Sequence, residues 1–217
     1  LGINFVSSLY GAILQSKSSF GYVAVVDDEV VGFATVTTNV RELYKAVVFR
    51  HGARLALAFA GKMFSLRRLK NALETLFYPS RVEKPDRDLP RAELLAMAVS
   101  EGCRRKGVGS ELVLRSFEEC SRRGIGKLKV VTGAFMEGAN KFYVECGFEP
   151  AGQFENHGIA SNVCVVEVGS AMAKWREPAR EVAVLAGQQR PEIVEISNRG
   201  LEKERAETTD QRQQTTG

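Results

Sequence analysis

The sequence predicts an α/β protein whose central, mixed β-sheet is flanked by helices. Three observations indicate this fold: strand patterns that form hairpins near both ends, helical patterns that alternate with strands between them, and a glycine-containing loop that joins a strand to a helix. The chain has 217 residues, of which 44% are hydrophobic, and this suffices for one domain with a substantial core. We expect this domain to span residues 1–175.

The first half of the chain predicts helices and a hairpin in turn. Apolar side chains at helical spacing indicate a short amphipathic helix at 5–14. Residues 21–26 and 30–38 are rich in β-branched and aromatic side chains and are joined by a short acidic turn, which is typical of a β-hairpin. The spaced apolar positions and scattered basic residues of 41–78 predict a helical insertion, and the polar, proline-bounded stretch 79–90 predicts a loop.

The second half alternates apolar strands with amphipathic helices. In chain order we expect a strand at 92–99, a helix at 108–123, a strand at 128–132, a helix at 138–146 and a hairpin of 148–155 with 162–168. This order predicts a mixed sheet with helices packed against it.

The end of the chain differs in composition from the rest. No aromatic residue follows Trp175, and residues 202–217 are almost entirely polar. Such a segment buries too little apolar surface to offset the entropy lost on ordering. We therefore expect a disordered tail at 176–217, in which 182–185 and 193–196 form a transient turn or dock weakly.

Composition argues against several functional classes. The formal net charge is +4, and because basic and acidic residues are interleaved, nucleic-acid binding is not expected. The four cysteines lack a C-x-x-C pair and the chain has only two histidines, so we expect reduced thiols and no metal site. No run of about eighteen apolar residues and no signal peptide is present, so we expect a soluble, cytoplasmic protein.

The stretch from Glu101 to Ser110 contains glycines and three consecutive cations between a predicted strand and a predicted helix. Glycines let the backbone approach an anion closely, and the first N–H groups of a helix have no internal partners. Together these features predict a phosphate site, to which the cations add attraction. The alternative interpretation is a simple turn with a solvated basic face.

Spacing disfavours the two best-known nucleotide motifs. Gly102 and Gly107 match the outer glycines of a P-loop, but Val108 and Gly109 stand where a Lys-Ser/Thr pair is required. A dinucleotide-binding loop needs a third glycine where this chain has Leu112. A nucleoside triphosphatase and a dinucleotide-dependent enzyme are therefore not expected.

Two motifs together resemble the GNAT superfamily of N-acetyltransferases. The Arg-x-x-Gly-x-Gly run at 104–109 looks like the acetyl-CoA pyrophosphate motif of that family, and the Phe-Tyr-x-x-x-Gly-Phe run at 142–148 is similar to the end of its downstream helix. The resemblance covers residues 92–168. It implies a three-layer GNAT-like fold, acetyl-CoA as co-substrate without a metal, and direct transfer of an acetyl or other acyl group to an amine.

The resemblance also implies roles for individual residues. Tyr143 would protonate the departing coenzyme A thiolate, and Glu93 would be the general base for the amine. A core aromatic and a solvated strand-end carboxylate are the corresponding structural alternatives. The backbone of the fourth strand and the glycine-containing loop would hold the coenzyme. The residues concerned are Met97, Ala98, Val99, Arg104, Arg105, Lys106, Gly107, Val108, Gly109 and Ser110.

Two further side chains on the 138–146 helix bear on the site. Many GNAT members carry an asparagine seven residues before the tyrosine, where this chain has Met136. Asn140 lies one turn later at helical spacing from Tyr143, and we expect it to contact the coenzyme instead. Cys146 has no histidine near it in the sequence, so we expect a packing role and no covalent acyl-enzyme.

The sequence leaves the acceptor and part of the function open. The insertion at 41–78 lies where acceptor specificity would reside, and its basic stretch at 46–64 alternatively suits a membrane surface or a partner protein. A module that binds or senses acyl-CoA without catalysis is the alternative to an enzyme. Either a small-molecule or a peptide amine fits as acceptor.

The start of the chain differs from the family pattern. GNAT members usually begin with a strand, whereas this chain begins at Leu1 with a predicted helix. We therefore expect the first edge strand of the family to be missing and that edge of the sheet to be unpaired.

Overall fold

The computed structural model of the chain describes residues 13, 16–43, 89–156, 158–175 and 191–196. The predicted helix at 5–14, apart from Ile13, lies outside the described residues. So do the predicted insertion beyond residue 43 and most of the predicted tail.

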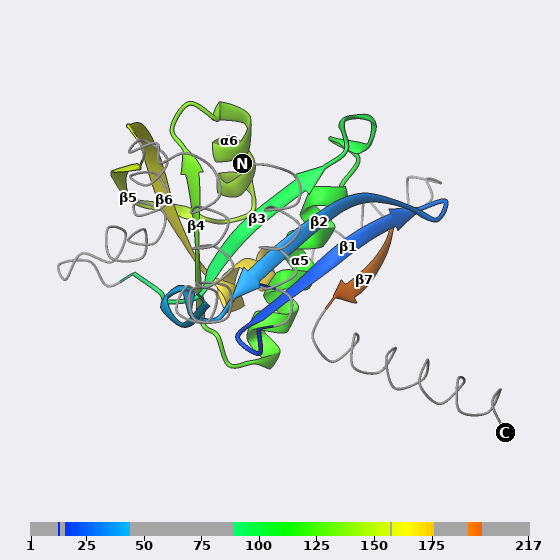
Figure 1. The fold of residues 1–217 in the computed structure, drawn as a ribbon, viewed down its shortest axis with the longest axis horizontal. Coiled ribbons are helices and arrows are strands. Elements are labelled where there is room, and N and C mark those ends of the chain that lie inside the picture. Colours follow the sequence, from blue (N-terminus) through cyan, green and yellow to red (C-terminus); the bar gives the residue numbers. More distant parts are fainter. Residues whose placement is uncertain (1–12, 14–15, 44–88, 157, 176–190, 197–217) are drawn as a thin grey trace, which may run out of the picture.

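Seven strands form one mixed sheet in the described part of the chain, in the spatial order β5-β6-β4-β3-β2-β1-β7 (Figure 1). In chain order they are β1 (Ser19–Val26), β2 (Glu29–Thr37), β3 (Glu93–Val99), β4 (Lys127–Gly133), β5 (Glu149–Asn156), β6 (Ile159–Glu167) and β7 (Glu192–Ile196). Strands β3 and β4 pair in parallel, and the other neighbours in this sheet pair antiparallel. The predicted mixed sheet flanked by helices is therefore confirmed.

The β1–β2 hairpin closes through an acidic two-residue turn. Asp27 and Asp28 both have left-handed backbone conformations, with φ values of 51° and 62°. Positive φ at both central residues matches the right-handed twist of the flanking strands, and aspartate tolerates it better than most residues. The predicted hairpin is confirmed at this turn.

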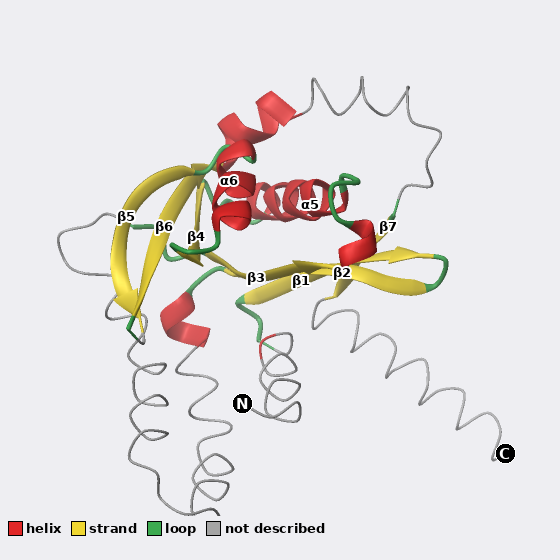
Figure 2. Cartoon of the chain, turned by 90° about the horizontal axis from the view of Figure 1, so that it is seen from above, coloured by secondary structure: helices red, strands yellow, loops and turns green. Residues whose placement is uncertain are grey.

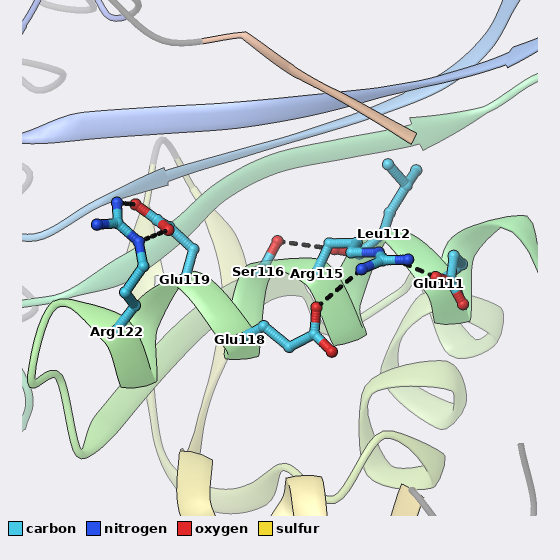
Figure 3. Close-up of polar contacts among 7 residues, drawn as sticks. All are labelled: Glu111, Leu112, Arg115, Ser116, Glu118, Glu119 and Arg122. Carbon is cyan, nitrogen blue, oxygen red and sulfur yellow. Dashed lines mark hydrogen bonds and ion pairs between the residues drawn. The ribbon is translucent and has the colours of Figure 1, made fainter. Parts of the chain in front are cut away.

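Helices α5 (Val108–Arg122) and α6 (Glu137–Glu145) lie on the same side of the sheet (Figure 2). The inner face of α5 buries apolar side chains such as Leu112 and Phe117, both fully buried. Its outer face carries Arg115, which pairs with Glu111 and Glu118, each at 3.1 Å (Figure 3). Such exposed pairs contribute only about 0.3–0.5 kcal/mol each, so burial of the inner face determines the position of this helix.

One lateral row of apolar side chains marks the face of the sheet that α5 covers. Strand pairing aligns Phe20, Val36, Leu94, Val130 and Cys164 across β1, β2, β3, β4 and β6. All five belong to the hydrophobic core. The guanidinium of Arg123, just beyond α5, lies 4.4 Å from the centre of the Phe20 ring, which confirms that this apolar row faces α5.

The C-terminal part of the described chain differs from the prediction in two places. Residues 168–175 form a helix, although Val168 was expected to end a strand. Within the tail predicted at 176–217, residues 193–196 were expected to form a transient turn or to dock weakly, and Glu192–Ile196 instead form a strand, β7.

Strand β7 pairs antiparallel with β1 over five residue pairs, from Gly21–Ile196 to Val25–Glu192. The edge that was expected to be unpaired is therefore covered by a strand from the other end of the chain. The side chain of Ile193 packs against the hydrophobic core, so three β-branched residues in five were enough to form a strand once a partner edge was present.

Candidate active site

The candidate site begins where β3 ends and the chain turns toward α5. The backbone N–H of Ser100 donates to the carbonyl oxygen of Val31 at 2.8 Å, and a 3₁₀ turn, η1 (Glu101–Cys103), follows. The Nε–H of Arg104 donates to the carbonyl oxygen of Val99 at 3.1 Å. This guanidinium therefore holds the loop against the end of β3.

The N-terminus of α5 is open to a ligand. Its N-cap is Gly107, whose φ of 82° is left-handed and which provides no side-chain cap. A Cβ atom added there would meet no atom of a described residue within 4 Å, so none of the described residues fills the space beside this backbone. The first N–H groups of an α-helix lack internal partners and the helix dipole places positive charge there. The observed geometry is that of an anion site.

Three cations precede this helix end. Arg104, Arg105 and Lys106 are exposed, and none of them forms an ion pair with another described residue. Arg105 has a left-handed conformation with φ of 58°, which costs a non-glycine residue about 1–2 kcal/mol. The loop thus keeps an unfavourable conformation while leaving its charges available for an anion.

The strands on either side of the site diverge. Strands β3 and β4 pair only at Glu93–Lys129 and Leu94–Val130, and Figure 1 shows them separating toward their C-terminal ends. Strand β3 stays paired with β2 up to Val99. Within the part of the chain that the structure describes, Met97, Ala98 and Val99 therefore have strand partners on the β2 side and none on the side of β4, which leaves their backbone on that side available to a ligand.

A bulge adds to this opening. The β2–β3 pairing shifts between Thr35–Ala96 and Val36–Leu94, which leaves Leu95 as the extra residue. Bulges bend the strand that carries them and often lie beside active sites. The bulge lies immediately after the last β3–β4 pair, so both irregularities begin at the same level of the sheet.

Three elements meet at the start of α5. A Cβ atom built on Gly109 would lie 3.3 Å from Cζ of Phe142 on α6 and 3.8 Å from Cε of Met97 on β3. Glycine at this position therefore allows close contact between the two helices beside the diverging strands. The start of α5 and the helix that carries Tyr143 are thus packed together.

The end of α6 fixes the position of the Tyr143 ring. The Phe148 N–H donates to the Tyr143 carbonyl oxygen and the Gly147 N–H to that of Val144, both at 2.9 Å, with a left-handed φ of 91° at Gly147. This is a Schellman motif, which requires glycine and brings the next residue back onto the helix. The rings of Phe148 and Tyr143 accordingly make a T-shaped contact with centroids 5.5 Å apart.

Tyr143 combines a core ring with a hydroxyl that has no hydrogen-bond partner among the described residues. Its side chain is 7% exposed, and no described residue hydrogen-bonds its hydroxyl group. Burial, and to a smaller extent the nearby Cys146 thiol, raises the pKa of Tyr143 to about 12. The phenol therefore stays protonated at neutral pH, as a proton donor must.

Asn140 is fully engaged within the protein. Its Oδ1 accepts from Thr132 at 2.6 Å and from Asn162 at 2.9 Å, and its Nδ2 donates to the carbonyl oxygens of Gly133 at 2.9 Å and Met136 at 2.8 Å. These four bonds use both donors and both acceptor positions of the amide. The predicted contact with the coenzyme has no hydrogen-bonding group left here. Asn140 instead ties the start of α6 to β4 and β6.

Glu93 lies at the opposite end of β3 from the loop. Its side chain is 4% exposed, not solvated as the structural alternative supposed, and its Oε2 lies 3.7 Å from Nζ of Lys129. Its neighbour Leu94 belongs to the apolar row under α5. Successive strand residues point to opposite faces, so Glu93 points away from α5 and α6.

The four cysteines are free thiols, and three of them, including Cys146, are buried. Burial, followed by the charge of Glu145, raises the pKa of Cys146 to about 12. This thiol is protonated at neutral pH and packs beside Tyr143 in the core. The described residues contain no group of three or more His, Cys, Asp or Glu side chains that could hold a metal ion. They also contain no helix long and apolar enough to cross a membrane.

The site residues predicted from the sequence lie in two separate places in the structure. Two further residues that bear on the site were not predicted. The backbone of Met97–Val99, the loop at 104–107 and the first turn of α5 adjoin one another beside Tyr143, whereas Glu93 lies at the closed end of the diverging strands. Lys129 and Thr132 were not predicted. A lysine between two apolar residues in a predicted strand was a signal for the first, because a charge at a core position needs a partner.

The fold and site define a protein in which an uncapped helix N-terminus lies beside two diverging strands, a geometry that suits an anionic ligand. Residues 5–148 match the model of the "Acetyltransferase (GNAT) family". This match covers more than half of the chain, and the chain belongs to this family of acetyltransferases. A comparison with curated proteins gave no match.

The solved structures to which the chain is similar are distant from it in sequence. The ribosomal-protein-S18-alanine N-acetyltransferase from Escherichia coli is 13% identical, with 77% of each chain covered and a TM-score of 0.47. An N-acetyltransferase from Staphylococcus aureus Mu50 is 16% identical, with 66% of this chain and 68% of that chain covered and a TM-score of 0.43. A GNAT family acetyltransferase from Elizabethkingia anophelis with acetyl-CoA bound is 13% identical, with 76% and 83% covered and a TM-score of 0.42.

Proposed function

We propose that this chain is an N-acetyltransferase that transfers the acetyl group of acetyl-CoA directly to an amine. One observation carries the proposal: an uncapped helix N-terminus with three exposed cations follows the strand that diverges from β4. Membership of the GNAT family supports acetyl transfer in general. The donor, the nitrogen acceptor and the direct mechanism belong to the proposal.

The residues at this end of β3 fit the donor. The N–H groups of Val108, Gly109 and Ser110 open α5 and suit the pyrophosphate, to which Arg105 and Lys106 add positive charge. The unpaired side of Met97–Val99 offers backbone groups to the pantetheine arm and the acyl carbonyl oxygen. A backbone N–H aimed at that oxygen stabilises the negative charge that develops on it.

The acceptor amine approaches from the face of the sheet that Glu93 occupies. The Glu93 carboxylate takes a proton from the amine, directly or through a water molecule, and the nitrogen then bonds to the acetyl carbon as the carbon–sulfur bond breaks. Because Glu93 is almost fully buried, a small or extended amine, such as a small metabolite or a peptide end, reaches it best.

The leaving thiolate departs on the other face. Tyr143 lies on α6, on the side of the sheet that α5 covers, and donates its phenolic proton to the sulfur. Cys146 stays protonated and buried, which supports direct transfer rather than an acyl-enzyme. Asn140 positions α6 rather than contacting the donor.

The test is the release of free coenzyme A thiol from acetyl-CoA across a panel of small amines and peptide amines. We expect turnover with at least one amine, a product heavier by one acetyl group, and no thiol release without acceptor. Tight binding of acetyl-CoA without turnover on any amine would instead favour a non-catalytic acyl-CoA-binding module.

A further inference from the structure

A row of polar side chains crosses the sheet on the face opposite α5. Strand pairing sets Ser19 beside Thr37, Thr37 beside Glu93, and Glu93 beside Lys129. Directly paired residues project from the same face of a sheet. This polar row is offset by one residue from the apolar row that faces α5, so it lies on the other face.

The polar row is buried although two of its members carry charge. Glu93 is 4% and Lys129 is 1% exposed, while Ser19 and Thr37 are neutral and equally buried. Among the described members of the row, Glu93 and Lys129 are the titratable ones. Taking either charge out of water is costly unless an opposite charge lies close by, and each of these two residues supplies such a charge to the other.

Two contacts of the lysine lie among the described residues. Its Nζ donates a hydrogen bond to the carbonyl oxygen of Pro90 at 2.6 Å, while Oε2 of Glu93 lies 3.7 Å away. The second distance is longer than a hydrogen bond, so Lys129 balances the charge of the carboxylate without donating to this oxygen. Pro90 lies just before β3 and fixes the ammonium in place.

The Glu93–Lys129 pair lies where β3 and β4 are still paired, next to the point at which they diverge. Glu93–Lys129 and Leu94–Val130 are the two β3–β4 pairs before the strands diverge. A charge held here lies at the closed end of the opening in which the proposed reaction takes place.

We propose that Lys129 is a positioning residue that holds the Glu93 carboxylate ionised and in place at the closed end of the diverging strands. The inference rests on the proposed role of Glu93 as general base. A carboxylate that loses a neighbouring ammonium takes up a proton at higher pH. Without Lys129, less of the base would be ionised near neutral pH.

The experiment compares pH–rate profiles of kcat/KM for the full chain and its variants, with acetyl-CoA and one amine from the panel. Lys129→Met removes the charge. If this variant does not fold, Lys129→Gln takes its place, because it also removes the charge but keeps a group that can donate to Pro90. We expect the acidic limb of the neutral variants to move up by about 1–3 pH units. Lys129→Arg keeps the charge, so its acidic limb should stay at the wild-type position even where kcat falls.

Two outcomes separate the inference from the function on which it rests. An acidic limb that disappears in Glu93→Gln but stays unmoved in Lys129→Gln overturns the role of Lys129 alone. A limb that persists in Glu93→Gln refutes the base assignment itself. Because every pH–rate profile uses the same amine, the amine's own ionisation affects all of them equally. The affinity of the Lys129 variants for acetyl-CoA, measured by calorimetry, should not change.

Discussion

A single tyrosine has two separable parts in this protein. The Tyr143 ring packs between Phe142 and Phe148, with centroids 5.3 and 5.5 Å away, and the Schellman motif at Gly147 fixes that packing. The hydroxyl takes no part in these contacts. Packing therefore explains why an aromatic residue is needed here, and only the proposed chemistry explains why it is a phenol.

Replacing Tyr143 with phenylalanine tests this division. The ring contacts remain, so we expect a change in stability below about 1 kcal/mol, unaltered acetyl-CoA affinity and a loss of turnover of about 100-fold. Tyr22→Phe is the matched control, because Tyr22 is also buried with a raised pKa but belongs to β1, far along the sheet from α6. Equal turnover in the two variants would show that Tyr143 is structural.

A second single residue, Asn140, is predicted to contribute to stability. Asn140→Ala leaves the four partners of the amide without it, and at about 1 kcal/mol for each net hydrogen bond we expect a loss of about 4 kcal/mol in the free energy of unfolding. Lys141→Ala is the control, because Lys141 is 80% exposed and makes one weak pair on the same helix. Urea unfolding measures both, and a control that loses as much as Asn140→Ala would contradict the assignment.

At the scale of elements, the start of α5 is the feature that most directly governs donor binding. Gly107→Ala forces a Cβ onto a left-handed residue, at a cost of about 1 kcal/mol, beside the N–H groups proposed to hold the pyrophosphate. That strain lowers stability, whereas the added methyl group occupies space proposed for the pyrophosphate, so we expect acetyl-CoA affinity to fall about 10-fold, which corresponds to about 1.4 kcal/mol of binding free energy.

The other end of α5 supplies a matched control. Gly124 has a similar φ of 72° and equally open space, but it follows the C-terminus of the helix. Gly124→Ala should cost similar stability in urea unfolding and leave acetyl-CoA affinity, measured by calorimetry, unchanged. If both variants bind acetyl-CoA like the wild type, the loop does not bind the donor.

Elements with a local sequence signal could be predicted, and those that depend on a distant partner could not. The acidic hairpin turn, α5 and α6 are set by turn residues, helical spacing and glycine ends that a sequence displays. The short, half-polar β7 forms because the edge of β1 is available to it, and no local pattern shows that edge.

The site follows the same division. The loop and the glycine of the Schellman motif were recognisable because backbone conformation demands particular residues. The pairing of Glu93 with Lys129 depends on the register of two strands, and these residues are 36 positions apart in the sequence (129 − 93). The engagement of Asn140 depends on β6. Register is set by tertiary packing, so the sequence showed the residues without showing their partners.

For the whole molecule, the sheet separates the two halves of the proposed reaction. The candidate base belongs to the polar row on one face, and the candidate acid lies with α5 and α6 on the other. The two faces of the sheet are connected through the opening between the diverging strands β3 and β4. Rigidity of the sheet on both sides of this opening therefore matters for the reaction, and its outer edge at β1 is closed by β7.

The contribution of β7 to the whole sheet is the last prediction. A chain ending at residue 190 lacks β7, exposes the backbone edge of β1 and loses the burial of Ile193 and Ile196, both only partly exposed. Full burial of such a side chain contributes about 1.5–3 kcal/mol, and each of these two partly exposed side chains contributes about half of that. We therefore expect a loss of about 2–3 kcal/mol in the free energy of unfolding. An exposed strand edge also favours pairing between chains, so this variant should associate at high concentration.

A chain ending at residue 197 keeps β7 and serves as the control in urea unfolding and light scattering. Because Tyr22 on β1 pairs with Glu195 on β7, loss of β7 should also lower the raised pKa of Tyr22, which its burial and the charges of Glu119 and Glu195 maintain. Spectroscopic titration of tyrosine would then show one phenol ionising at lower pH in the shorter chain. If the two chains match in stability, association and titration, then β7 contributes nothing to closing the sheet.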